Sequence, residues 1–324
     1  MEMNTKISRR EALARTGLLA GAALFASKFG AAPAAAQSAA PAPATGAAPA
    51  TFRFCLNTST IRGQKLGIVK EIEIASQAGY SAIEPWVEAV NAYTKSGGTL
   101  ADLRKRIADA GLTVEDAIAF SEWIVDDDAR RARGLEQARR DMDTVAQIGG
   151  KRIAAPPSGA TNGPKPEFAR VVERYRALLE LGDKMGIIPQ FEIWGHSANY
   201  NRLGECVWVA METGHPSACV LADVFHLYKG GSNFSGLRLV GAQTIQMLHM
   251  NDYPADPPRE KNNDGFRVDP GEGIAPWPQI MRDLRQAAGT KILSLELFSQ
   301  KYWSEDAMTV AKTGLDKMKA VAAL

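Results

Sequence analysis

The order of apolar and polar positions from residue 52 onward alternates between two patterns. Short runs rich in β-branched and aromatic residues are typical of strands, and longer segments repeat apolar residues with the period of a helix. The predicted strands are residues 54–58, 82–86, 113–120, 152–155, 189–193, 219–224, 244–250 and 292–297. The predicted helices include residues 66–78, 99–110, 128–148, 167–185 and 275–288, and several of them end at a glycine, which suits the left-handed position after a helix.

This alternation of strand and helix predicts the fold class. Eight strand–helix units between residues 51 and 324 predict an α/β fold, a single (β/α)8 TIM barrel, whose usual length is about 250 residues. A doubly wound open sheet is the alternative, but no glycine-rich dinucleotide-binding motif follows the first predicted strand. In a barrel of parallel strands, residues at the carboxyl ends of the strands face the active-site mouth.

Residues 1–36 predict a twin-arginine signal peptide rather than part of the fold. Arg9 and Arg10 precede an apolar stretch at 18–25, and alanines at 34–36 offer a cleavage site. An ordinary secretory signal is the alternative. The apolar stretch is too short to predict a membrane span, so we expect no stable membrane insertion. Residues 37–50 are rich in Pro and Ala and predict a linker, and the expected location is the periplasm or another exported site.

The net charge changes if residues 1–36 are removed. The full chain has 38 basic and 36 acidic side chains, and the removed part carries five basic and two acidic ones, which leaves a formal charge of −1. No basic stripe remains, and this argues against nucleic acid as a partner.

The three cysteines do not form a disulfide framework, so we expect buried thiols, with a bridge between Cys206 and Cys219 as the open alternative.

One potential metal ligand stands near the end of each of the last four predicted strands: Glu192, Asp223, His249 and Glu296. A single buried Asp, Glu or His is usually paired with neighbouring polar groups, but equivalent positions on four successive strands favour a shared site. Three carboxylates meeting in a buried mouth would repel one another unless a cation neutralised them. Oxygen-rich ligands with one imidazole suit one divalent metal, with Mn²⁺ as the first expectation and Mg²⁺, Co²⁺, Zn²⁺ or Fe²⁺ as alternatives.

Several short motifs accompany these ligands. They are the glutamate-bearing fifth and eighth strands, D-x-x-H at 223–226, HMND at 249–252 and RxxPGxG at 267–273. With these motifs, residues 52–324 resemble the xylose-isomerase-like barrel superfamily and, within it, the sugar phosphate isomerase/epimerase group related to ketose 3-epimerases, hydroxypyruvate isomerase and inosose dehydratase. The resemblance implies that one metal is held by Glu192, Asp223, His249 and Glu296. It also implies that His226 and Arg267 contact the substrate.

The same residues suggest a chemistry. A metal held against the carbonyl and the neighbouring hydroxyl of a ketose acidifies the adjacent C–H bond. Glu192 and Glu296 are the expected catalytic pair, because two carboxylates on opposite sides can remove a proton from one face and return it to the other. Arg267 is expected to stabilise charge on the enediolate, with a surface ion pair to Asp264 or Asp269 as its alternative.

Three further residues are candidates for substrate binding: Glu84, Trp194 and His196. Glu84 ends the second predicted strand and is equally consistent with a structural hydrogen bond. Trp194 and His196 lie on the loop after the fifth strand. Trp194 is suited either to stacking on a sugar ring or to capping the core.

Three functional hypotheses follow. The first is a divalent-metal-dependent sugar isomerase or epimerase that acts on an exported, unphosphorylated carbohydrate through an enediolate. The second is a metal-dependent lyase or dehydratase that acts on a keto-sugar or 3-keto-glycoside, since elimination begins with the same proton abstraction. The third is a non-catalytic carbohydrate-binding barrel, which the two opposed glutamates argue against. The expected partner is a small carbohydrate, and a homo-oligomer is compatible with the sequence.

Overall fold

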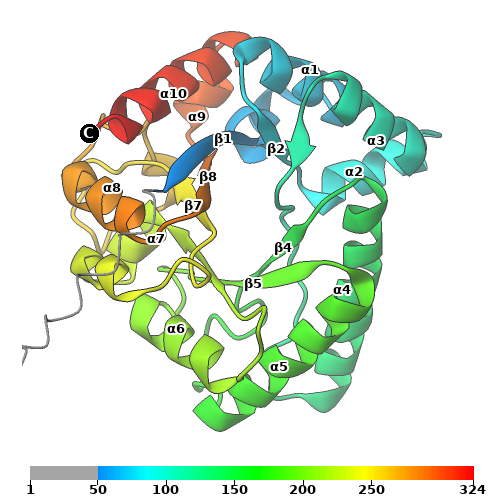
Figure 1. Ribbon diagram of the computed structural model, residues 1–324, viewed down its shortest axis with the longest axis vertical. Helices are drawn as coiled ribbons and strands as arrows, with labels where there is room; N and C mark the ends of the chain where they lie inside the picture. The colour runs from blue at the N-terminus through cyan, green and yellow to red at the C-terminus, as the bar shows by residue number, and fades with distance from the viewer. Residues whose placement is uncertain (1–49) are drawn as a thin grey trace, which may run out of the picture. The chain divides into compact units, whose positions relative to one another are not determined.

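The computed structural model describes residues 50–324, which form a barrel of parallel strands surrounded by helices (Figure 1). The predicted signal peptide and all but the last residue of the predicted linker lie outside the described residues. The strands are β1 (Thr51–Asn57), β2 (Ala82–Glu84), β3 (Thr113–Val114), β4 (Arg152–Ala155), β5 (Ile188–Glu192), β6 (Val220–Asp223), β7 (Met247–Met250) and β8 (Thr290–Leu295). Their order, β3-β2-β1-β8-β7-β6-β5-β4, confirms the predicted (β/α)8 barrel.

The helices follow the strands in the order expected for such a barrel. They are α1 (Ile68–Ala78), α2 (Val87–Lys95), α3 (Leu100–Asp109), α4 (Asp128–Gln147), α5 (Phe168–Met185), α6 (Leu203–Glu212), α7 (Val224–Lys229), α8 (Trp277–Gln286), α9 (Gln300–Trp303) and α10 (Ala307–Ala322). Short 3₁₀ helices are η1 (Thr58–Gln64), η2 (Phe234–Leu239) and η3 (Asp264–Phe266). Asp127 begins α4, because its side chain accepts a hydrogen bond from the Arg130 N–H.

The third strand is shorter than predicted. It ends at Val114, whereas the sequence predicted a strand over residues 113–120. The backbone beyond it bonds to the loop after β2, since Ile118 N–H donates to the Pro85 carbonyl at 3.0 Å. Within residues 50–324, one backbone–backbone hydrogen bond joins the segment after β3 to β4, in which Ala154 N–H donates to the Ala117 carbonyl at 2.9 Å, and the Arg152 side chain adds a bond to the Glu115 carbonyl. Two edges that meet through so few bonds do not form a strand ladder.

The two-residue period of the strands explains how polar side chains reach the interior of the barrel. A small apolar cluster, separate from the main core, includes Cys55, Ala82, Leu221, Met247 and Ile292. Two positions further along the same five strands come Asn57, Glu84, Asp223, His249 and Ser294, all fully buried. The residues between them, such as Ala222 and Leu248, belong to the main core that packs against the helices. A buried strand can therefore end on a polar residue that faces the mouth.

Two further predictions concern the thiols and the membrane. Cys55, Cys206 and Cys219 are all buried and free, so the expectation of buried thiols is confirmed and the bridge between Cys206 and Cys219 is not formed. Within residues 50–324, no helix is both long enough and apolar enough to cross a membrane.

Candidate active site

The four predicted metal ligands come together at the carboxyl ends of their strands. Glu192 and Asp223 are the last residues of β5 and β6, His249 lies in β7, and Glu296 directly follows β8. Nδ1 of His249 lies 3.1 Å from Oε2 of Glu296, 3.8 Å from Oδ2 of Asp223 and 3.9 Å from Oε1 of Glu192. All four side chains are buried.

The hydrogen bonding of His249 tests whether this group suits a cation. Its Nε2 lies 2.8 Å from Oε1 of Glu84, so Nε2 is the ring nitrogen that donates to a carboxylate. Nδ1 has no hydrogen-bond partner within residues 50–324, although it is buried and faces three carboxylates. The spacing of 3.1 to 3.9 Å suits atoms that share one ion at bond lengths of about 2.0–2.2 Å. Asp223, His249 and Glu296 therefore fit a divalent metal, since one ligand atom of each lies within 4.8 Å of the others, and Glu192 lies beside this group with Oε1 3.9 Å from Nδ1 of His249.

The carboxylates in this group have different electrostatic environments. Burial raises the pKa of Glu192 to about 8, and the charges of Glu296 and Asp223 add to this rise while His249 opposes it. Glu296 is equally buried, but His249 and Arg267 outweigh the effect of burial and lower its pKa. Glu192 thus holds a proton that a bound cation would have to displace, whereas Glu296 is ionised.

Arg267 supplies the positive charge closest to the carboxylates. Its Nη1 donates to Oδ2 of Asp223 and to Oε2 of Glu296, both at 2.8 Å, and its side chain is 1% exposed. The opposite edge of the guanidinium donates to Asp264 through Nε and Nη2. The sequence analysis gave a surface ion pair with Asp264 as the alternative role of Arg267. The ion pair with Asp264 is present, but Arg267 is not at the surface, since it is buried beside the predicted ligands.

His226 lies against the same guanidinium. Its backbone N–H donates to Oδ1 of Asp223 at 2.7 Å, because Asp223 caps α7. Ring Nε2 lies 3.2 Å from Nη2 of Arg267, which can only donate, so Nε2 is the acceptor and Nδ1 carries the proton. Burial lowers the pKa of His226 to about 4, which keeps the ring neutral. Nδ1 has no partner among the described residues and is free to donate to a ligand.

A cavity of about 170 Å³ opens above this group. Its polar lining includes Glu192, His196, His226, Arg267 and Glu296, and its aromatic lining is Trp86, Phe120, Trp194 and Phe298. The predicted substrate contacts His226, Arg267, His196 and Trp194 therefore face one space. Glu84 does not line it, since its carboxylate lies against the His249 ring and accepts from Ser294, which are structural hydrogen bonds of the kind given as its alternative role.

A comparison with known families identifies the barrel. The family model described as xylose isomerase-like TIM barrel matches residues 72–321. This chain belongs to the xylose isomerase-like TIM barrel family.

Three named proteins are similar to this chain over most of their length. An inosose isomerase from Halalkalibacterium halodurans is 25% identical over 268 residues, which cover 82% of this chain and 94% of that protein. A structure of the IolI protein with a bound zinc atom matches at a TM-score of 0.77 and 19% identity, covering 84% of this chain and 98% of that one. A structure of D-psicose 3-epimerase in the presence of D-fructose matches at a TM-score of 0.66 and 20% sequence identity, covering 84% of this chain and 100% of that one. At these identities the structural likeness shows the shared fold.

Two asparagines position the carboxylates of this xylose isomerase-like barrel, and the sequence analysis did not single them out as site residues. Asn251 donates from Nδ2 to Oδ2 of Asp223 at 2.8 Å. Asn57, at the end of β1, donates from Nδ2 to Oε1 of Glu296 at 3.1 Å and accepts from Nε1 of Trp86. Asn57 could have been found by its place at a strand end, which is the signal that pointed to the four ligands.

Asp252 organises the loop that follows Arg267. Its carboxylate accepts hydrogen bonds from Gly271 N–H at 3.0 Å, from Ala275 N–H at 2.9 Å and from Nε1 of Trp277 at 2.7 Å. A Cβ atom on Gly273 would lie only 2.3 Å from Oδ1 of Asp252, so this position needs glycine. The PGxG part of the motif is therefore a loop folded around one buried carboxylate.

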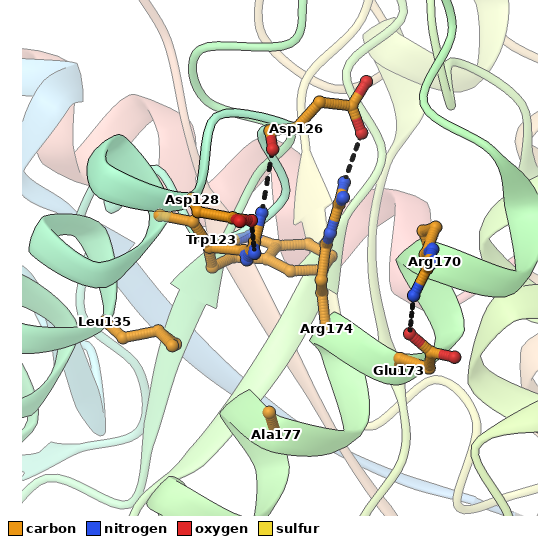
Figure 2. A pocket seen from close by; sticks show the side chains of 9 residues that line it. Trp123, Asp126, Asp128, Leu135, Arg170, Glu173, Arg174 and Ala177 are labelled. Carbon is orange, nitrogen blue, oxygen red and sulfur yellow. Dashed lines mark hydrogen bonds and ion pairs between the residues drawn. The ribbon is translucent and has the colours of Figure 1, made fainter.

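A second hollow, of about 460 Å³, lies between α4 and α5 and has a different character (Figure 2). It is lined by three arginines, but each of them already has an acidic partner. Arg174 pairs with Asp126 at 2.8 Å, Arg170 with Glu173 at 3.1 Å, and Arg131 with Asp128. Because these charges neutralise one another and none of the predicted ligands is present, the hollow is not the candidate active site.

Proposed function

We propose that this barrel is a divalent-metal-dependent isomerase or epimerase that moves a proton at the carbon next to the carbonyl of a small carbohydrate. The observation that carries the proposal is the placement of two glutamates. Glu192 ends β5 and Glu296 directly follows β8, and these strands are separated by β6 and β7, yet both glutamates line the same small cavity beside Nδ1 of His249. The family relatives named inosose isomerase and D-psicose 3-epimerase support an enzyme of the isomerase or epimerase type.

The side chains divide the reaction between them. One of the two glutamates removes the proton next to the carbonyl, and the other returns a proton to the same or the neighbouring carbon. Arg267 points Nη1 into the group of carboxylates and stabilises negative charge on the enediolate oxygen. The Nδ1–H of His226 donates to a substrate hydroxyl or carbonyl. A divalent cation held by Glu192, Asp223, His249 and Glu296 would polarise the carbonyl and acidify the adjacent C–H bond.

The cavity and its lining restrict the substrate. A volume of about 170 Å³ is below the range of about 300–1,000 Å³ that is typical of sites for drug-sized ligands, so the reacting part is one small ring or chain. Aromatic walls formed by Trp86, Phe120 and Phe298 suit the apolar faces of a sugar. We propose Mn²⁺ as the first metal to test, and an exported location on the basis of Arg9 and Arg10.

The test uses the metal-reconstituted protein in D₂O with free ketoses and 3-keto-glycosides, followed by proton NMR. The proposal predicts deuterium next to the carbonyl and an epimer or aldose as product, with Mn²⁺ compared against Mg²⁺, Co²⁺, Zn²⁺ and Fe²⁺. The variant Glu296→Gln keeps the size of the side chain and should lose exchange by about 10²- to 10⁴-fold. Full activity in a folded Glu296→Gln protein would overturn the proposal.

Elimination is the second candidate, because it shares the first proton transfer. His196 lines the cavity 5.3 Å from the ring of His226, between centroids, and burial lowers its pKa. A neutral imidazole at this place could pass a proton to a leaving group through its N–H. Release of an aglycone or a dehydrated sugar would make the protein a lyase or dehydratase. In that case His196→Ala should lose this release while deuterium exchange persists.

A further inference from the structure

A groove lies next to the catalytic cavity, between α2 and α4. We call it the α2–α4 groove, and it has a volume of about 340 Å³, twice that of the cavity. Asn91 and Lys95 of α2 line one side, and Gln137 and Asp141 of α4 line the other. None of these four residues belongs to the proposed catalytic machinery.

The groove and the cavity share a wall. Trp86, Ile118 and Phe120 line both spaces. The rings of Trp86 and Phe120 lie 5.2 Å apart, between centroids, at an interplanar angle of 59°. Phe120 is 39% exposed, which is unusual for a large aromatic residue at the edge of a deep site. A molecule that extends out of the cavity past these rings would lie against residues that also line the groove.

The chemistry of the groove suits an uncharged, hydroxyl-rich ring. Amides of Asn91 and Gln137 can donate and accept hydrogen bonds, and Asp141 offers a carboxylate with up to four acceptor sites. Asp141 is only 8% exposed, and burial raises the pKa of its carboxyl to about 6. One lysine faces two acids, Glu88 and Asp141, so the groove does not select an anion such as a phosphate.

We propose that the α2–α4 groove is a second sugar subsite, which holds an uncharged ring joined by a glycosidic bond to the keto sugar in the catalytic cavity. The proposal rests on the proposed function for the identity of the reacting ring. The cavity itself has room for one small ring, so a second ring has to lie outside it, and the groove shares three lining residues with the cavity. The substrate class is then a keto-glycoside rather than a free ketose.

The experiment separates binding from turnover. The Mn²⁺-loaded protein is titrated calorimetrically with 3-keto-glucose and with 3-keto-cellobiose, and deuterium exchange is measured with both. Gln137→Ala and Asn91→Ala should each weaken binding of the two-ring compound by roughly 3- to 10-fold, the value of a hydrogen bond, and leave the single ring unchanged. Gln147→Ala, on the same helix outside the groove, is the matched control and should change neither affinity.

A bulky variant gives a second, independent reading. Ala92 lines the groove from an exposed position on α2, so Ala92→Trp fills the space without disturbing the core. Ala92→Trp should prevent the binding of 3-keto-cellobiose and leave the binding of 3-keto-glucose unchanged. Equal affinities for the two compounds in the wild type, unaffected by any groove variant, would overturn the subsite and leave the proposed function standing. If the groove variants lose binding of 3-keto-cellobiose, but neither the wild type nor any variant exchanges deuterium, the result would support the subsite and refute the proposed reaction.

Discussion

Oε1 of Glu84 lies 2.8 Å from Nε2 of His249, and both side chains are completely buried. This contact determines which nitrogen of the imidazole faces the three carboxylates, because a ring that donates through Nε2 presents the lone pair of Nδ1. Glu84 therefore acts on the proposed metal through His249 and is a positioning residue rather than a substrate contact. A carboxylate behind a ligating histidine also raises the basicity of that ligand.

The first prediction concerns this contact. Glu84→Gln should weaken metal binding by about 10- to 100-fold, because the amide keeps the shape but loses the negative charge behind the ring. Calorimetric titration of the metal-free protein with Mn²⁺ measures the change. Glu71→Gln, at a buried carboxylate of α1, is the matched control and should leave the affinity unchanged. An unaltered affinity in Glu84→Gln would mean that His249 is oriented by its packing alone.

The second prediction concerns pH. Burial and the neighbouring carboxylates raise the pKa of Glu192 to about 8 in the metal-free protein, so a cation must displace a proton from Glu192 below that pH. Metal affinity should therefore increase with pH up to about 8 and then level off, and should fall by up to about tenfold per pH unit per displaced proton below it. Proton release, measured by calorimetry in buffers of different ionisation enthalpy, should be smaller in Glu192→Gln. Affinity that is independent of pH between 6 and 8 would contradict the role of Glu192 as a ligand.

The third prediction concerns stability around Arg267. Arg267→Met should destabilise the metal-free protein by about 3–5 kcal/mol, because Asp223 and Glu296 would be left buried without their guanidinium partner. Saturating Mn²⁺ should recover part of this loss, since a cation replaces the missing positive charge. Urea denaturation with and without metal measures both effects. Arg139→Met, at an exposed ion pair on α4, should show no measurable change, and an equal loss in the two variants would argue against a special role for Arg267.

The fourth prediction concerns the loop around Asp252. Gly273→Ala should lower the free energy of unfolding by about 1–3 kcal/mol, because the new Cβ would lie 2.3 Å from both Oδ1 of Asp252 and the Tyr253 carbonyl. Gly204→Ala is the control, since a Cβ at this position of α6 meets no atom of the described residues within 4 Å, and the substitution should stabilise by at most about 1 kcal/mol. Thermal denaturation compares the two. A wild-type melting temperature for Gly273→Ala would show that the loop can move away without cost.

The local pattern of the sequence was enough to predict the strands and the positions at which they end. Side chains alternate across a strand with a period of two, and parallel strands all point the same way, so Glu192, Asp223, His249 and Glu296 could be placed at one mouth without a structure. The predicted bounds of β4 are those observed, and the other strands except β3 shift by only a few residues. The end of β3 was wrong because the backbone beyond Val114 bonds to the loop after β2, a contact between segments that local periodicity does not describe.

The sequence by itself therefore determined the barrel and the residues that reach its mouth, because both follow from the repeat of each strand. Only the tertiary structure decided which of these residues touch one another. Glu84 and His249 are 165 positions apart, and Asn57 and Glu296 are 239 apart. Such contacts depend on how far each strand is staggered when the barrel closes and on the direction of each side chain across the interior. The tertiary structure also separates Glu84 from the substrate cavity and buries Arg267, which follows η3, beside Asp223, because both outcomes depend on how segments distant in the sequence pack together.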